Sequence, residues 1–276
     1  MENDWEERFQ RGLKMAEAEY HHPDCEKSGA ADGCRSFCFH HHRPTEQAVL
    51  LIHGFTACPY EMLELGQFLC SRGHNVFGVR LAGHGTHVSD FAKTTGADWE
   101  ASAQKGLEIA ASLGRKVTVI GESMGGALAV LLASSYPDCV HRLVLCAPCF
   151  EIANPMAYLA RYAFIRKVVP QTDMGVALEW QRQYWYGKIP TKAVAELVTV
   201  AGKARKLAPE IKAPVLVIQA ENDQMVRWQG ARRFFEKLAS SKKTLKLFES
   251  GHHNLTIDLN PQKQQVFEWI LKFIEE

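Results

Sequence analysis

This sequence of 276 residues lacks a long apolar run, an excess of charge of one sign and a recognisable N-terminal signal. No stretch approaches the roughly 18 consecutive apolar residues that a bilayer-spanning helix needs, so we expect no integral membrane segment. Residues 1–8 are acidic and lack an apolar core, which argues against a secretory signal and predicts a soluble, cytoplasmic protein. The formal net charge of +1 gives no reason to expect a nucleic-acid or membrane-surface partner.

Cysteine is plentiful, with eight residues, yet we expect neither a disulfide framework nor a metal site. Cys146-Ala-Pro-Cys149 has the spacing of a thiol redox motif, but Cys146 reads as the last inward residue of a strand, which favours buried structural thiols. A second group, of cysteine and histidine residues near the N-terminus, lacks the tight paired spacing of zinc ligands. We therefore expect a polar loop leading into a hairpin there. The members of this group are Cys25, Cys34, Cys38, His21, His22, His40, His41 and His42. No metal and no organic cofactor is expected.

Short apolar runs alternate with helical patterns along most of the chain, which predicts an α/β fold with a doubly wound, mostly parallel sheet. The run Ala48–Ile52 is apolar throughout, as in strands buried on both faces. The other predicted strands are 35–39, 75–79, 116–120, 143–146, 215–218 and 244–248. The predicted helices lie near the N-terminus, where Trp5, Phe9 and Leu13 recur, and at 60–72, 98–113, 126–136, 228–239 and 261–275.

Residues 150–210 interrupt this alternation, because they carry many aromatic side chains and no convincing strand. We expect a helical cap there, with helices near 155–167, 173–186 and 191–202. The chain then divides into a first part of the core, residues 1–149 with an N-terminal extension 1–45, the cap, and a second part, residues 211–276.

Gly121-Glu122-Ser123-Met124-Gly125 fits the pattern Gly-x-Ser-x-Gly between a predicted strand and a predicted helix. Strand, tight turn and helix is the setting in which this pattern forms a nucleophile elbow. The turn strains the serine backbone, and side chains at the two flanking positions would crowd the strand against the helix. Ser123 is therefore the candidate nucleophile.

A serine hydroxyl needs a base, itself oriented by an acid, and on such a sheet the acid precedes the histidine in the chain. Asp223 follows the strand 215–218 and is the candidate acid, with Glu221 as a less favoured neighbour. His252 follows the last strand and is the candidate base, because Gly251 would permit the turn that aims its ring at the serine. His253 is the competitor, so the register is open by one residue.

An oxyanion hole on this sheet uses the amide after the nucleophile and one from an earlier loop. Met124 follows Ser123, and Phe55 lies in the loop His53-Gly54-Phe55 after a buried strand. We therefore assign the two amides to Phe55 and Met124. His53 is expected to brace this loop rather than act as a second base.

Five motifs in order carry a resemblance to the α/β-hydrolase fold, and more narrowly to bacterial carboxylesterases and monoacylglycerol-lipase-like hydrolases with a small cap. They are His53-Gly54-Phe55, Gly83-His84-Gly85, Gly121–Gly125, Glu221-Asn-Asp223 and Ser250-Gly251-His252, and the similarity runs from about residue 47 to the C-terminus. The first 45 residues and the cap depart from the family pattern, so their roles stay open.

The resemblance implies a serine hydrolase that cleaves small-molecule carboxylic esters with small to medium apolar acyl groups through an acyl-enzyme. The same triad could instead act on a thioester, a lactone or a carbon–carbon bond beside a carbonyl, because fold does not fix chemistry. A non-catalytic or thiol-redox protein on this scaffold is the alternative from another class. The oligomeric state stays open.

Overall fold

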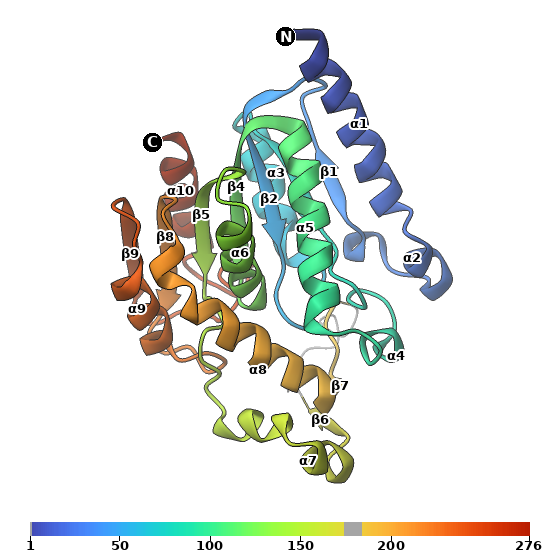
Figure 1. Ribbon diagram of the computed structural model, residues 1–276, viewed down its shortest axis with the longest axis vertical. Helices are drawn as coiled ribbons and strands as arrows, with labels where there is room; N and C mark the ends of the chain where they lie inside the picture. The colour runs from blue at the N-terminus through green and yellow to red at the C-terminus, as the bar shows by residue number, and fades with distance from the viewer. Residues whose placement is uncertain (1, 174–183) are drawn as a thin grey trace.

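A computed structural model describes residues 2–173 and 184–276 of the chain and contains a seven-stranded, mostly parallel sheet (Figure 1). The strand order is β1-β3-β2-β4-β5-β8-β9, and only β1 runs antiparallel to its neighbour. The strands are β1 (Phe37–Phe39), β2 (Thr45–Ile52), β3 (Asn75–Val79), β4 (Gly114–Glu122), β5 (Val140–Cys146), β8 (Val215–Ala220) and β9 (Lys243–Phe248). The predicted doubly wound sheet is thus confirmed, with β1 starting two residues later than expected.

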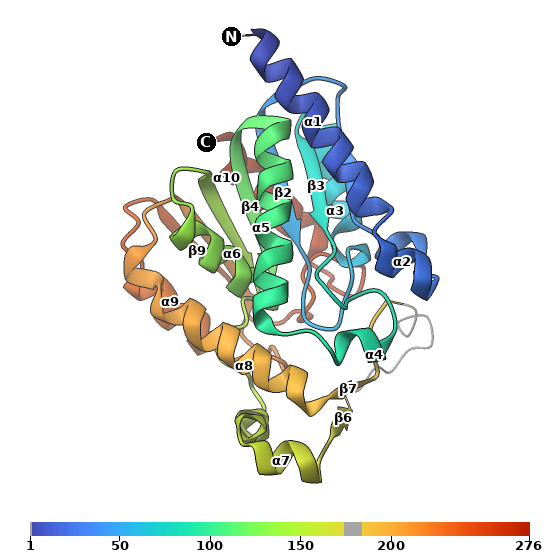
Figure 2. The same ribbon diagram turned by 45° about the vertical axis from the view of Figure 1, so that its right-hand side comes forward.

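Helices cover both faces of this sheet, α5 and α6 on one and α3 and α10 on the other (Figures 1 and 2). The α-helices are α1 (Glu2–Tyr20), α2 (Pro23–Ser28), α3 (Tyr60–Ser71), α4 (Val88–Phe91), α5 (Gly96–Leu113), α6 (Met124–Ser135), α7 (Ala163–Val168), α8 (Thr191–Lys206), α9 (Trp228–Lys237) and α10 (Lys263–Glu275). Short 3-10 turns are η1 (Asp32–Cys34), η2 (Pro155–Arg161) and η4 (Ala208–Glu210).

Two apolar cores follow from the alternation of side chains along the central strands. In β2, Leu50 and Ile52 join the core beneath α5 and α6, whereas Val49 and Leu51 join the core beneath α3 and α10. All four side chains are fully buried. An apolar run without polar alternation is therefore the pattern that a strand covered on both faces requires.

The N-terminal extension packs against this core rather than standing apart from it. Helix α1 lies along α5 (Figure 2), and β1 extends the sheet beside β3. The helices α1 and α5 approach closely at Gly12, where a Cβ atom would lie 2.6 Å from the Cβ of Ser112. The first turn of α5 is fixed by a capping box between Thr95 and Asp98, so the helix starts at Gly96 instead of the predicted Asp98.

The segment between β5 and β8 lies across one end of the sheet, opposite both termini (Figure 1). The predicted helix 155–167 is split into η2 and α7, and the predicted helix 191–202 is the longer α8. The expectation of no strand here was wrong, because β6 (Gln171–Asp173) and β7 (Lys188–Pro190) form a small antiparallel pair. The predicted helix 173–186 falls mainly on residues 174–183, outside the described residues.

Substituting two helical glycines tests the close contact of α1 with α5. Gly202→Ala should raise the free energy of unfolding by roughly 0.5–1 kcal/mol, because alanine favours helix and nothing lies within 4 Å of the added methyl group. Gly12→Ala should lower it by about 1–3 kcal/mol, because α1 must shift away from Ser112. Urea unfolding measures both, and a stabilising Gly12→Ala would show that the helices do not meet there.

Candidate active site

Ser123 sits on a sharp turn between β4 and α6. Its backbone angles, φ 55° and ψ −116°, lie where a residue with a side chain is strained. The turn is held by hydrogen bonds on both sides of the serine: its amide donates to the Cys146 carbonyl at 2.9 Å, and its carbonyl accepts from the Cys149 amide at 2.9 Å. The strand β5 therefore anchors the turn that presents the hydroxyl.

Two glycines make this turn sterically possible. A Cβ at Gly121 would overlap the carbonyl of Gly125, and one at Gly125 would overlap the carbonyl of Ile52. Neither glycine has a positive φ, so close approach and not conformational freedom accounts for their presence. The turn is thus compressed between its own strand and β2.

Ser123, Asp223 and His253 form one hydrogen-bonded chain. The Nε2 atom of His253 lies 3.0 Å from Ser123 Oγ, and its Nδ1 atom lies 2.7 Å from Asp223 Oδ2. An ionised carboxylate can only accept, so Nδ1 carries the proton and Nε2 is free to accept the serine proton. The serine is 7% exposed, which leaves its hydroxyl in a largely dry site.

Asp223 has a hydrogen-bond donor for each of its acceptor positions. Oδ2 accepts from His253 and from Gln219 Nε2 at 2.9 Å, and Oδ1 accepts from the amides of Met225 at 2.8 Å and Val226 at 3.0 Å. Burial alone would raise the pKa of this carboxyl, but the charge and hydrogen bond of His253 and the two amides together lower it below its ordinary value. The carboxylate therefore stays ionised where a histidine titrates.

The predicted register of the histidine is corrected by one residue, from His252 to His253. The Nδ1 atom of His252 accepts the amide of Asn254 at 3.1 Å, so this ring closes its own loop. Gly251 has no positive φ; its amide donates to Asn222 Oδ1 at 2.9 Å, and a Cβ there would lie 3.2 Å from the Cβ of Ala220. The glycine serves close packing instead of the sharp turn on which the prediction relied.

The loop after β2 lies against the nucleophile. A Cβ at Gly54 would be 3.3 Å from the Cβ of Ser123, which shows how closely the loop approaches. The amide of Met124, at the first position of α6, has no partner within its helix. These positions suit the oxyanion assignment of Phe55 and Met124, which stays a prediction.

His53 braces this loop, as expected. Its Nε2 accepts the amide of Leu81 at 3.2 Å, so Nδ1 is the protonated nitrogen and donates to the Gly54 carbonyl at 2.9 Å. Burial lowers the pKa of His53 to about 4, which keeps the ring neutral in this tautomer. A neutral ring with both nitrogens engaged is no second base.

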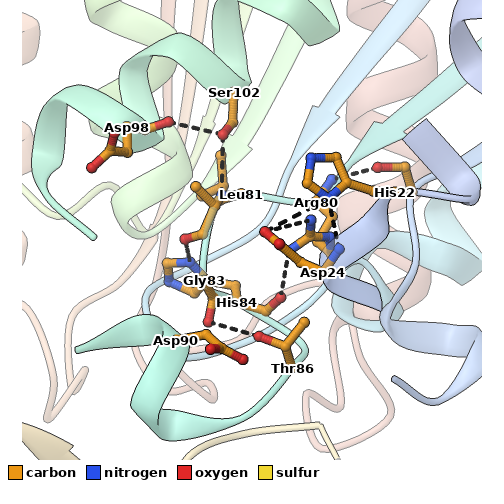
Figure 3. A network of polar contacts seen from close by, with 12 residues as sticks. His22, Asp24, Arg80, Leu81, Gly83, His84, Thr86, Asp90, Asp98 and Ser102 are labelled. Atoms are coloured by element: carbon orange, nitrogen blue, oxygen red, sulfur yellow. Dashed lines mark hydrogen bonds and ion pairs between the residues drawn. The ribbon is translucent and has the colours of Figure 1, made fainter. Parts of the chain in front are cut away.

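The loop after β3 is fastened by the polar contacts drawn in Figure 3. The buried Arg80 donates to the carbonyl of His84 at 3.2 Å and lies 4.0 Å from Asp24 in α2, which connects the N-terminal extension to the loop. The amide of Ala82 donates to Ser102 Oγ at 3.0 Å. The ring of His84 packs edge to face against that of His53, with 5.2 Å between the ring centroids. This loop therefore supports the loop that carries Phe55.

Sequence reasoning missed a set of buried and partly buried polar residues around the triad. Gln219 orients Asp223, as described above, while the side chains of Glu61 and Asn254 contact each other between the loops that carry Phe55 and His253. Glu122 is fully buried at the end of β4. The sequence contained one signal for Glu122. An acidic residue within Gly-x-Ser-x-Gly, at the end of a strand predicted to be buried, must have polar partners.

The Cys146 and Cys149 thiols belong to opposite faces of the sheet, since Cys146 lies in the core under α3 and α10 and Cys149 in the core under α5 and α6. Burial raises the pKa of Cys149 to about 12, and that of Cys146 well above its ordinary value. Redox thiols need the opposite shift. Within the described ranges, no cluster of three or more His, Cys, Asp or Glu residues could hold a metal ion.

A cavity of about 580 Å³ lies beside the loop that carries His84, lined by residues 85–88, 173 and 184–188. Ser123 is not among the residues that line this cavity. No helix in the described part of the chain has the length and apolarity needed to cross a membrane.

Comparison with known proteins gives one family and several relatives. A family model described as serine aminopeptidase, S33, matches residues 43–260. The chain is 27% identical over 225 residues to a thermostable monoacylglycerol lipase of Bacillus sp. (strain H-257), covering 82% of this chain and 89% of the relative. It is 24% identical over 233 residues to a carboxylesterase of Bacillus subtilis (strain 168), covering 84% and 93%.

Solved structures show the same fold. One, from a study of the metagenome-derived lipolytic enzymes LipS and LipT, superposes with a TM-score of 0.80 at 26% identity, covering 88% of this chain and 98% of that one. A monoacylglycerol lipase of Paleococcus ferrophilus gives 0.72 at 21% identity, covering 87% and 97%.

The lowered pKa of Asp223 predicts a pH-dependent contribution to stability. Because the folded pKa lies below the unfolded one, the ionised carboxylate stabilises the fold above about pH 3.9 and loses this effect as the pH falls through the folded pKa. Asp223→Asn should cost about 1–3 kcal/mol at pH 7 and progressively less in acid. Urea unfolding of both proteins over a range of pH measures the difference between their free energies of unfolding. A difference that grows in acid would contradict the prediction.

Proposed function

We propose that this chain, which belongs to the serine aminopeptidase S33 family, hydrolyses carboxylic esters with small to medium apolar acyl groups through an acyl-enzyme on Ser123. The observation that carries the proposal is the pair of contacts of His253, with Ser123 Oγ at 3.0 Å and with Asp223 Oδ2 at 2.7 Å. A base within hydrogen-bond reach of a serine, and itself held by an acid, is the arrangement that activates a hydroxyl.

In the first step, His253 takes the proton of Ser123 as Oγ attacks the ester carbonyl. Asp223 holds the tautomer and stabilises the imidazolium, without itself taking the proton. The imidazolium then protonates the departing alcohol. In the second step, His253 takes a proton from water, which attacks the carbonyl of the acyl-enzyme. The imidazolium then returns this proton to Ser123 Oγ as the bond between Oγ and the acyl carbon breaks, which releases the acid and restores the serine.

The amides of Phe55 and Met124 are proposed to bind the oxyanion of each tetrahedral intermediate. Donors fixed by the backbone need no rearrangement as the charge develops, and losing one typically costs a hundredfold or more in rate. The strained turn at Ser123 and the braced loop at Gly54 supply this rigidity.

Several features favour an ester over the peptide bond suggested by the family's description. An aminopeptidase must bind the ammonium group of its substrate, for which a free carboxylate is the usual partner. The carboxyl groups that the described hydrogen bonds place around Ser123 are those of Glu61, Glu122 and Asp223, and all three are buried and engaged. The relatives named above, a monoacylglycerol lipase and a carboxylesterase, also act on esters.

We further propose that residues 150–210 form a cap that sizes the acyl site. Tyr186 supports this, because its hydroxyl donates to the Gly83 carbonyl at 2.7 Å and accepts from the Thr86 amide at 3.1 Å. Tyr184 stacks on Tyr60 at 3.7 Å between ring centroids. The residues after 183 are thus anchored to the loops that flank the nucleophile.

The assignment of the base predicts different outcomes for two adjacent histidines. His253→Ala should lower kcat for a p-nitrophenyl ester by about three orders of magnitude or more, because no group then takes the serine proton. His252→Ala should keep kcat within about tenfold, since that ring only closes its loop. Circular dichroism confirms that both variants fold. The opposite ranking would return the base to His252.

A series of p-nitrophenyl esters from acetate to palmitate tests the reaction and the size of the acyl site. We expect turnover that disappears in Ser123→Ala and is fastest with acyl chains shorter than palmitate, because a capped site limits chain length. If a folded protein reacts with a fluorophosphonate but cleaves no ester, the nucleophile acts on a thioester, lactone or carbon–carbon bond instead. Full activity in Ser123→Ala would overturn the nucleophile itself.

A further inference from the structure

Two buried carboxyl groups lie behind the nucleophile and take no part in the triad. Glu61 is in the first turn of α3 and is 1% exposed, and Glu122 ends β4 next to Ser123 and is fully buried. In the described part of the chain, neither forms an ion pair with lysine or arginine. A buried carboxylate without a cation is costly, so the pair cannot hold two charges cheaply.

The partners of Glu61 are those of a carboxylate. Its Oε2 accepts the amide of Gly54 at 2.6 Å, and its Oε1 accepts the side-chain amide of Asn254. Both partners are N–H groups, which can only donate. An ionised Glu61 satisfies both without a proton of its own.

The partners of Glu122 include a hydroxyl group that can accept a proton from its carboxyl group. Its Oε1 accepts the amide of Leu255, and its Oε2 lies 2.6 Å from Thr256 Oγ1. That hydroxyl also lies 2.9 Å from the Glu61 carbonyl, which can only accept. A hydroxyl has one hydrogen. If Thr256 donates it to the carbonyl, Glu122 must donate to Thr256.

The electrostatic surroundings agree with this division. Burial and the charge of Glu61 raise the pKa of Glu122 well above its ordinary value, although the Thr256 hydroxyl and the amides of Leu255 and Thr256 act to lower it. Burial also raises the pKa of Glu61 above its ordinary value, but the Gly54 amide, the charge of His253 and the Asn254 side chain limit that rise. Burial raises the pKa of the Cys58 and Cys146 thiols, and the nearby carboxyl groups raise it further. Both thiols therefore stay neutral.

We propose that Glu61 and Glu122 share one proton, held by Glu122, and that the charge on Glu61 positions the site and stabilises the imidazolium of His253. Glu61 joins Gly54, which precedes the proposed oxyanion donor Phe55, to Asn254, which follows the proposed base. One carboxylate thus fixes two loops relative to each other. It also adds a second negative charge, besides Asp223, near the imidazolium that forms during the reaction.

This inference rests on the proposed function for its catalytic consequence, although the position of the proton does not. Glu61→Gln should lower kcat roughly tenfold to a hundredfold with a smaller change in KM, because the loops lose a charged acceptor and the imidazolium loses a neighbouring charge. The acidic limb of its pH–rate profile should move to lower pH, because protonating the base becomes harder without that negative charge. A purely structural role would not move the limb.

Glu122→Gln should keep kcat within about twofold and leave the acidic limb in place. Its amide can donate to Thr256 Oγ1 while its oxygen accepts the Leu255 amide, so it reproduces a protonated carboxyl group. Glu64→Gln is the matched control on α3, because Glu64 is half-exposed and paired with Lys263. The pH–rate profile of Glu64→Gln should match that of the native enzyme.

Infrared spectroscopy locates the proton without any substrate. The native protein at neutral pH should show the carbonyl stretch of a protonated carboxyl group, retained in Glu61→Gln and lost in Glu122→Gln. A missing band, or one lost only in Glu61→Gln, would overturn the proposal, as would equal kinetic losses in the two variants. If no ester is cleaved, the rate of labelling of Ser123 by a fluorophosphonate replaces kcat, so failure of the proposed function is seen separately.

Discussion

The backbone turn at Ser123 is the constraint on which the rest of the site depends. A residue held at φ 55° costs of order 1–3 kcal/mol, and it persists only where its surroundings leave no alternative. Here β2, β4 and α6 meet so closely that neither Gly121 nor Gly125 could carry a side chain. The sheet therefore fixes the nucleophile, and the flanking loops are built to meet it.

Three buried carboxyl groups surround this one serine, and each is accommodated differently. Asp223 has donors for all its acceptor positions and stays ionised. Glu61 accepts from two N–H groups and lies near the charge of His253, whereas Glu122 lies near the charge of Glu61 and shares the Thr256 hydroxyl with a backbone carbonyl. Burial raises the pKa of all three carboxyl groups, so the charges beside each group decide which one keeps its proton.

The sheet was predictable because strands such as β2 and β3 are buried on both faces and therefore apolar throughout. Ser123 and Asp223 were predictable because each follows such a strand at the edge where ligands bind. The choice between His252 and His253 was not, because it depends on how a loop packs against Ala220, which local sequence does not encode. Glu61 and Asn254 meet across 193 residues of sequence, beyond the reach of any local pattern. The strands β6 and β7 are three residues each and too short to show a period.

The order in which the chain is made has a consequence for when this protein becomes chemically competent. Ser123 and His253 are 130 residues apart in the sequence. At typical rates of synthesis of about 5–20 residues per second, Ser123 is made roughly 6–26 seconds before His253. A partly synthesised chain thus contains Ser123 without the residue that is proposed to take its proton. The hydrogen-bonded chain of Ser123, His253 and Asp223 can form only after the last strand and the loop behind it have been made.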